Sequence, residues 1–304
     1  MSGNGSANTD NIITILDFDK LWDYNDPEKT EKKFREILPD LKDHKDFEYR
    51  SAYLQLLTQI ARTLGLQMKF DEAHKLLDEI DPLIDDEFYV AKIRYLLERG
   101  RTFRSSKQVE RSRDLFIKAY ELAVKHNEDN LAVDAAHMMG IIEPFEEAQR
   151  WNELAMDIAE KSDDKKAKKW LGPLYNNTAW NYHDNNDFDE ALKLFEKNVV
   201  WHTERNSKQE LIIAKWSVAR ALRSLDKTDK AIKMQLDLLD EITEKGLEQD
   251  GYIYEELGEL YLIKENTEES KKYFGLAYDL LSKDKWLAEY EKDRLDRIRE
   301  LGKK

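Results

Sequence analysis

The sequence predicts an all-α protein, built as a solenoid of about seven helical hairpins and closed by a C-terminal helix. Two observations predict this fold: a pattern of small and large apolar residues recurs along nearly the whole chain, and few residues interrupt regular structure. Only 11 glycines and 5 prolines occur among 304 residues, while 41% of the residues are hydrophobic. This composition provides apolar surface for a long core and leaves few helix breaks.

The repeat is clearest in the segment FDEALKLFEKNV, which begins at Phe188. Ala191 follows the phenylalanine after three positions and Phe195 follows after four more, and Ala179 lies twelve residues before Ala191. These offsets place small and large side chains on one face of a helix. The same offsets recur at Phe70, Ala73 and Leu77 and at Val109, Ser112 and Phe116.

This pattern resembles the tetratricopeptide repeat, a unit of about 34 residues whose two antiparallel helices carry small residues at positions 8, 20 and 27. Large residues stand at positions 4, 11 and 24 of that unit. The resemblance implies a right-handed superhelical solenoid of helical hairpins. On this numbering the hairpins start 36 to 43 residues apart, near Asn11, Leu54, Ile93, Asp129, Gly172, Ile212 and Gly251.

Positions 8 and 20 show how well the pattern holds, because small residues fill thirteen of their fourteen places. Two helices approach closely only where side chains are small, so each hairpin is expected to pack tightly against the next. Polar residues at three packing positions, Asn152, Asn198 and Gln235, predict looser joints in the fourth, fifth and sixth hairpins. Position 8 holds Phe18, Ala61, Gly100, Ala136, Ala179, Ala219 and Gly258, and position 20 holds Thr30, Ala73, Ser112, Ala148, Ala191, Ala231 and Ser270.

The two ends of the sequence differ from the repeats. We expect residues 1–10 to be a flexible tail, residues 11–284 to form the repeat array, and residues 285–304 to form a capping helix and a charged tail. The last segment combines a charged face with an apolar stripe, as a capping helix requires. That stripe consists of Leu287, Tyr290, Leu295, Ile298 and Leu301.

No segment suggests a membrane protein or a secreted one. The N-terminus lacks the features of a secretory signal, and no stretch approaches the roughly 20 apolar residues of a membrane-spanning helix. We therefore expect a cytoplasmic protein without a membrane contact.

Composition and motifs also argue against catalysis. The sequence has no cysteine, which excludes disulfides and thiolate metal sites, and its histidines show no paired metal-ligand spacing. Nucleotide-binding and nucleophile motifs are absent from the sequence. We expect no enzyme activity, no cofactor and no metal. The formal charge of −14 argues against nucleic acid as a partner.

The resemblance implies which residues face a ligand. In tetratricopeptide proteins the first helix of each hairpin lines a concave groove, and positions 2, 5, 9, 12 and 13 commonly contact the ligand. Arginine offers bidentate donors to carboxylates, asparagine can hold a peptide backbone, and tryptophan gives a large contact area. The predicted ligand-binding residues are Arg62, Arg101, Arg104, His137, Asn176, Asn177, Trp180, His183, Trp216, Arg220 and Arg223.

These residues predict a scaffold that binds a protein or peptide partner, with an acidic segment or the C-terminal end of a polypeptide as the fitting ligand. The alternative is that the arginines pair with Glu98, Asp134 and Asp184 of neighbouring helices. Asn177 matches one residue of the carboxylate clamp of chaperone-binding members, but the flanking hairpins lack the others.

Two other functions stay open as hypotheses. One is a structural scaffold that self-associates into a homo-oligomer, and the other, with less support, is binding of RNA. The tryptophans outside the predicted groove are expected to fill the core or seal turns. They are Trp22, Trp151, Trp170, Trp201 and Trp286.

Overall fold

The computed structural model describes residues 20–303, without the side chain of Lys285. Between these residues the protein folds into helices and turns with no β-strand. It divides into two compact units, Met1–Trp170 (unit 1) and Leu171–Lys304 (unit 2), a division that the sequence did not predict. The predicted tail 1–10, the first hairpin's start at Asn11 and its Phe18 lie outside the described residues.

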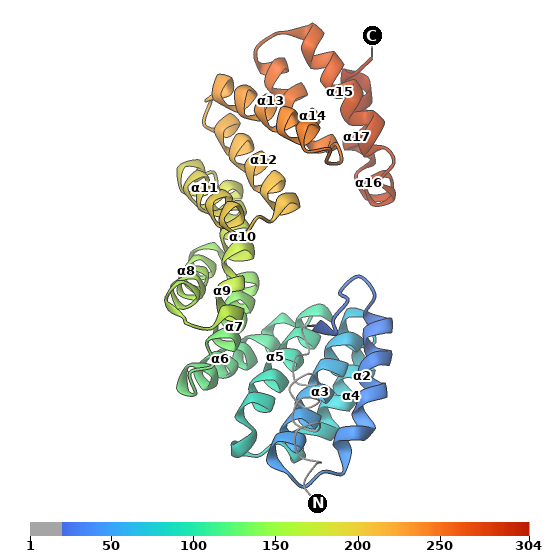
Figure 1. The fold of residues 1–304 in the computed structure, drawn as a ribbon, viewed down its shortest axis with the longest axis vertical. Coiled ribbons are helices and arrows are strands. Elements are labelled where there is room, and N and C mark those ends of the chain that lie inside the picture. The colour runs from blue at the N-terminus through green and yellow to red at the C-terminus, as the bar shows by residue number, and fades with distance from the viewer. Residues whose placement is uncertain (1–19, 304) are drawn as a thin grey trace, which may run out of the picture. The chain divides into compact units, whose positions relative to one another are not determined.

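Unit 1 consists of successive helical hairpins (Figure 1). Each helix packs mainly on the helices next to it in the sequence, which is the contact pattern of a repeat array. The helices are α2 (Pro27–Lys42), α3 (Phe47–Leu66), α4 (Phe70–Ile80), α5 (Tyr89–Ser105), α6 (Val109–Lys125), α7 (Asp129–Ile142), α8 (Phe145–Lys161) and the short α9 (Lys165–Lys169). Two 3-10 turns, η2 (Asp81–Leu83) and η3 (Asp86–Phe88), connect α4 to α5.

Unit 2 repeats the arrangement with three hairpins and a C-terminal cap (Figure 1). Its hairpin helices are α10 (Leu171–Asp184), α11 (Phe188–Glu204), α12 (Lys208–Ser224), α13 (Thr228–Glu244), α14 (Gly251–Ile263) and α15 (Thr267–Leu281). The cap is α16 (Lys285–Tyr290) and α17 (Lys292–Leu301), and α17 packs on α15. None of the helices between residues 20 and 303 is both long and apolar enough to span a membrane.

The turn inside most hairpins has one geometry. The residue at position 15 has a positive φ, the left-handed conformation that ends a helix. In the last hairpin, for example, the N–H of Asn266 donates to the carbonyl of Tyr261 at 2.9 Å across this turn. The fourth hairpin turns instead at Glu143, which has extended backbone and precedes Pro144. The left-handed residues at position 15 are Met68, Lys107, Asn186, Asp226 and Glu265.

The small residues at positions 8 and 20 lie where the helices touch. All the alanines at these positions are buried. A Cβ placed on Gly100 would lie only 2.5 Å from the ring of Phe116, and one placed on Gly258 would lie 2.9 Å from the ring of Phe274. Each phenylalanine occupies position 24 of the same hairpin, so the large residue fills the space that the small one leaves.

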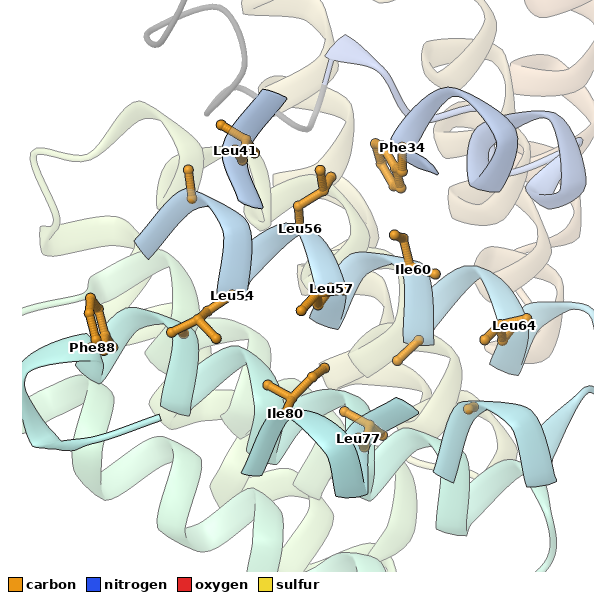
Figure 2. Packing of buried hydrophobic residues seen from close by; sticks show 14 residues of the cluster. Phe34, Leu41, Leu54, Leu56, Leu57, Ile60, Leu64, Leu77, Ile80 and Phe88 are labelled. Atoms are coloured by element: carbon orange, nitrogen blue, oxygen red, sulfur yellow. The ribbon is translucent and has the colours of Figure 1, made fainter. Parts of the chain in front are cut away.

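One hydrophobic cluster of unit 1 lies around α2, α3 and α4 (Figure 2), and a second lies around α5, α6 and α7. Phe34 and Leu41 of α2 meet the apolar side of α3, and α4 contributes Leu77 and Ile80. These side chains have no exposed surface. Because α3 is covered by α2, α4 and α5, buried residues occupy almost every position from Leu54 to Leu64.

Asn152, Asn198 and Gln235 are all buried, and a Cβ on Gly140 would overlap the Asn152 amide oxygen, so the fourth hairpin packs closely at this residue. The prediction of a single capping helix was wrong, since the helix breaks at Glu291 between α16 and α17. As a result Tyr290 is 65% exposed instead of joining the apolar stripe.

Candidate functional site

In unit 1 the first helices α3, α5 and α7 bring two predicted arginines onto a row of acidic side chains. Arg62 Nη1 donates to Glu98 Oε1 at 3.3 Å, and Arg101 Nη1 donates to the same oxygen at 2.6 Å. Arg101 Nη2 also donates to Asp134. Glu98 is only 3% exposed, so its charge is balanced by two guanidinium groups inside the protein.

The environment keeps these groups charged. Burial acts to lower the pKa of Arg101, but the nearby Asp134 and Glu98 carboxylates outweigh it and raise that pKa. Burial acts to raise the pKa of Asp134, but Arg101 and Arg62 hold it below its usual value. The structure therefore shows the internal pairing that the sequence left as an alternative for Arg62 and Arg101. The positive charges of these two arginines are compensated mainly by Glu98 and Asp134, and the ion pairs join neighbouring helices.

The other two predicted residues of unit 1 are not paired in this way. Arg104 is exposed, has no ion pair within residues 20–303, and lines a cavity of about 210 Å³ with Arg62 and Arg101. The His137 ring lies 5.4 Å from the Trp170 ring, and burial lowers the pKa of His137. His137 Nδ1 is buried without a hydrogen-bond partner in the part of the protein that the structure describes.

A second cavity of unit 1 shares Arg62, Glu98 and Arg101 with the first and is also lined by residues that the sequence reasoning missed. Its volume is also about 210 Å³. Trp22 and Trp170 line it, and Trp22 also packs against the hydrophobic cluster of α2, α3 and α4, as expected. We call it the cationic cavity; its lining is Trp22, Tyr24, Gln59, Arg62, Arg94, Glu98, Arg101, Asn130, Leu131, Asp134, Lys166, Lys169 and Trp170.

In unit 2 two predicted arginines share one buried acid. Arg223 binds Glu256 through two hydrogen bonds of 2.6 and 3.0 Å, and Arg220 Nε lies 4.0 Å from the same carboxylate. Burial raises the pKa of Glu256 although Arg223 acts in the opposite direction. The acidic partner is Glu256 and not the predicted Asp184, which lies 3.9 Å from His183 Nδ1.

Aromatic rings follow one another along the first helices of unit 2. The rings of Trp180 on α10 and Trp216 on α12 are 5.8 Å apart, and the rings of Trp216 and Tyr252 on α14 are 6.1 Å apart. Trp216 Nε1 donates to the Tyr252 carbonyl at 3.1 Å, which fixes the indole. Trp180 also packs on Phe195. We call Trp180, Trp216 and Tyr252 the aromatic row; the sequence predicted the first two of them.

Two predicted asparagines lie beside this row. Asn176, one helical turn before Trp180, donates from Nδ2 to Asn177 Oδ1 at 3.2 Å. The Oδ1 atom of Asn176 is buried and has no partner among the residues that the structure describes. An acceptor of this kind suits a backbone N–H of a bound segment.

His183 packs against Trp180 of the aromatic row and belongs to a hydrogen-bonded group with Ser224 and Arg220. Its Nε2 is 2.9 Å from Ser224 Oγ, and the same oxygen accepts a hydrogen bond from Arg220 at 2.7 Å. Because Ser224 accepts from Arg220, its hydroxyl proton is available to His183, whose Nε2 is then the acceptor of a neutral ring. Burial, followed by the charge of Arg220, lowers the pKa of His183.

This arrangement predicts a loss of stability in acid. Below the ordinary histidine pKa of 6.5 the unfolded protein binds a proton that folded His183 does not, so the unfolding free energy falls as pH decreases toward the lowered pKa. We expect His183→Gln to weaken this dependence between about pH 7.5 and pH 5.5, as measured by urea unfolding. His202, also buried with a lowered pKa, keeps its own contribution in both proteins. Equal pH dependence in both proteins would contradict the assignment.

No protein-family model and no curated protein matches this sequence. Solved structures do match in fold. The apo form of RapI shares 11% identity at a TM-score of 0.72, over 96% of this chain and 83% of RapI. A signal transduction ATPase from Pyrococcus horikoshii, which carries a tetratricopeptide repeat sensor, shares 16% identity at a TM-score of 0.69. The match covers 90% of this chain and 41% of the ATPase.

The protein has the tetratricopeptide-repeat fold. It is also similar to NprR, solved in complex with its cognate peptide NprX, at 16% identity and a TM-score of 0.50. That match covers 99% of this chain and 89% of NprR. Within residues 20–303 no group of histidine and acidic side chains is placed to hold a metal ion.

Proposed function

We propose that the protein is a non-catalytic scaffold that binds an extended segment of a partner protein or a peptide along the first helices α10, α12 and α14. The observation that carries the proposal is a break in the pairing of arginines with acids. In the second, third and sixth hairpins an arginine at position 9 pairs with an acid at position 6 of the next hairpin, as Arg62 does with Glu98. At the fifth hairpin the same place holds Trp180, which meets Trp216.

The break changes the chemistry of the surface. In an ion pair each charged group already has its partner inside the protein. The rings of Trp180 and Trp216 are half-buried instead and keep apolar area available to a ligand. Tryptophan is one of the residues enriched among the few that dominate binding energy at protein interfaces. The aromatic row therefore provides the apolar contact, and Asn176 and Asn177 provide hydrogen bonds to the backbone of the segment.

Arg220 gives the segment an acidic preference. It shares Glu256 with Arg223, which holds that carboxylate through both of its oxygens, while Arg220 lies 4.0 Å away. One acid thus faces two guanidinium groups, so a carboxylate of the ligand beside Arg220 completes the charge balance. In unit 1, Arg62 and Arg101 mainly hold the helices together.

The likeness to NprR supports the proposal at the level of fold, since that protein was solved in complex with its cognate peptide.

Selection from a displayed library of random peptides, with the full-length protein as bait, tests whether such a segment binds. We expect enriched peptides with apolar and acidic residues. On titration of an enriched peptide, the indole N–H resonances of Trp180 and Trp216 should shift among the seven tryptophans, while Trp286 on α16 stays unchanged. Failure to enrich peptides, or shifts only at Trp286, would refute the proposal.

A further inference from the structure

A groove on α11 of unit 2 plays no part in the proposed peptide contact. Its volume is about 670 Å³, and residues of α10 and α11 line it together with Arg205, which directly follows α11. None of the lining residues belongs to the aromatic row. Six of them form two rows along α11, four residues apart within each row, so they share one face of the helix. We call this cavity the α11 groove; the two rows are Glu196, Val200 and Glu204, and Lys197, Trp201 and Arg205.

The centre of the α11 groove is apolar. Val200 is 57% exposed, and Trp201 follows it in the lining. The Trp201 ring is held in place, because a Cβ on Gly172 would lie only 2.8 Å from it and the Arg205 guanidinium lies 4.0 Å from its centroid. An exposed aliphatic side chain beside a fixed aromatic ring is a surface that a partner can cover without first ordering it.

The charges of the α11 groove differ from those of the whole protein. Two acids and three bases line the groove, whereas the protein has a formal charge of −14. Two copies of an acidic protein repel each other, so they approach most easily where the negative excess is missing. A basic partner would instead be attracted to the acidic remainder of the surface. The lining bases are Lys193, Lys197 and Arg205, and the lining acids are Glu196 and Glu204.

The order of residues along α11 is complementary to itself. A two-fold axis that crosses α11 sets the helix antiparallel to α11 of a second copy, so residues equally far from the axis meet. With the axis between Val200 and Trp201, the valine of each copy meets the tryptophan of the other at the centre. Lys197 then lies opposite Glu204 of the second copy, and both side chains are exposed.

A second charged pair supports the same register. Glu196 lies opposite Arg205 of the second copy when the axis passes between Val200 and Trp201. Moving the axis onto Val200 would instead place Glu196 opposite Glu204, and like charges in contact oppose association. The Glu204 and Arg205 side chains lie 3.6 Å apart within one copy but are 67% and 38% exposed, so a second copy can reach both.

We propose that two copies of this chain associate through their α11 grooves, antiparallel about a two-fold axis between Val200 and Trp201. The apolar centre stabilises the contact, and the oppositely charged pairs on both sides of it set the register. The contact uses the second helix of a hairpin and shares no residue with the aromatic row. It therefore stands apart from the peptide binding proposed for the first helices.

Sedimentation velocity of the full-length protein tests for the dimer. A weak dimer has a Kd in the micromolar range, so concentrations from about 1 to about 200 μM should show a shift from monomer to dimer. Val200→Asp should weaken self-association by about a hundredfold or more, because it places two carboxylates together at the axis. The matched control is Val124→Asp, since Val124 is 48% exposed on α6 and lies outside the groove. The control should dimerise like the original protein.

A charge exchange tests the register. Lys197→Glu should weaken self-association by about tenfold or more, because it places two glutamates opposite each other. Lys197→Glu/Glu204→Lys should restore it, since the pair between the copies is present again with its signs reversed. Lys233→Glu changes the net charge equally on exposed α13, outside the groove, and should have little effect.

Three results would overturn the proposal. The first is a monomer at every concentration, and the second is an equal loss of dimer in Val200→Asp and Val124→Asp. The third is a double charge variant that associates no better than Lys197→Glu alone. Circular dichroism checks that each variant keeps its helices. Because the groove and the aromatic row share no residue, none of these results decides whether a peptide binds.

Discussion

Replacing Glu98 with alanine is expected to destabilise the protein by about 3 kcal/mol. The carboxylate is shared by Arg62 and Arg101, whose side chains are only 22% and 15% exposed. Its removal leaves two largely buried guanidinium groups without their common partner, and water cannot fully replace it. Urea unfolding followed by circular dichroism measures the loss as a lower midpoint at an unchanged slope.

The matched control for this prediction is Glu121→Ala. Glu121 is exposed on α6, so the same change of charge and size should alter the unfolding free energy by less than about 0.5 kcal/mol. Glu98→Gln should fall between the two, because it keeps the shape and some hydrogen bonds but loses the charge. If Glu98→Ala were as stable as the control, the arginines would not depend on this acid.

Trp180→Ala/Trp216→Ala is expected to reduce affinity for a selected peptide by at least about a hundredfold, since interface tryptophans commonly contribute about 2 kcal/mol or more each. The two rings are the centre of the aromatic row, 5.8 Å apart on successive first helices. Their truncation removes apolar contact area and leaves a gap beside Asn176. Titration calorimetry with the original and variant proteins measures the effect.

Trp286→Ala provides the control for tryptophan loss. Trp286 is 58% exposed on α16, outside the aromatic row, so its removal should leave the affinity unchanged. Because Trp216 also donates to the Tyr252 carbonyl, the milder Trp216→Phe separates a loss of binding from a loss of structure. A double variant that folds and still binds with full affinity would place the peptide elsewhere.

Much of the fold could be predicted from the sequence because packing in a repeat array is local. Small residues at positions 8 and 20 mark helix contacts within a hairpin, and Gly100 against Phe116 shows the reason. The arginine–acid pairs also had a signal, since Glu98, Asp134 and Glu256 all stand at position 6 of their hairpins. Reading positions 9 and 6 together would have predicted Glu256 as the partner of Arg220.

No repeated sequence position predicted the cationic cavity. Lys166 and Lys169 belong to α9, a short helix between the fourth and fifth hairpins that the period of the repeat does not contain. Trp22 lies before α2 and comes close to Gln59 of α3 through tertiary folding. Contacts that lie outside the repeat pattern depend on how each segment packs, and one sequence does not reveal that.

The break in the C-terminal cap shows another limit. An apolar stripe at helical spacing predicted one helix over Lys285 to Gly302, but α16 ends at Tyr290 and α17 starts at Lys292. Leu287, Leu295 and Ile298 are still buried. Periodicity identified most of the buried residues correctly but did not reveal the break between the helices.

Photo-cross-linking tests the central claim most directly. The photoreactive residue p-benzoylphenylalanine is placed at Asn177, exposed on α10 beside the aromatic row, or at Lys233, exposed on the second helix α13. The account predicts that a selected peptide cross-links from position 177 and not from position 233. Cross-linking from 233 alone, or equally from both, would contradict binding along the first helices.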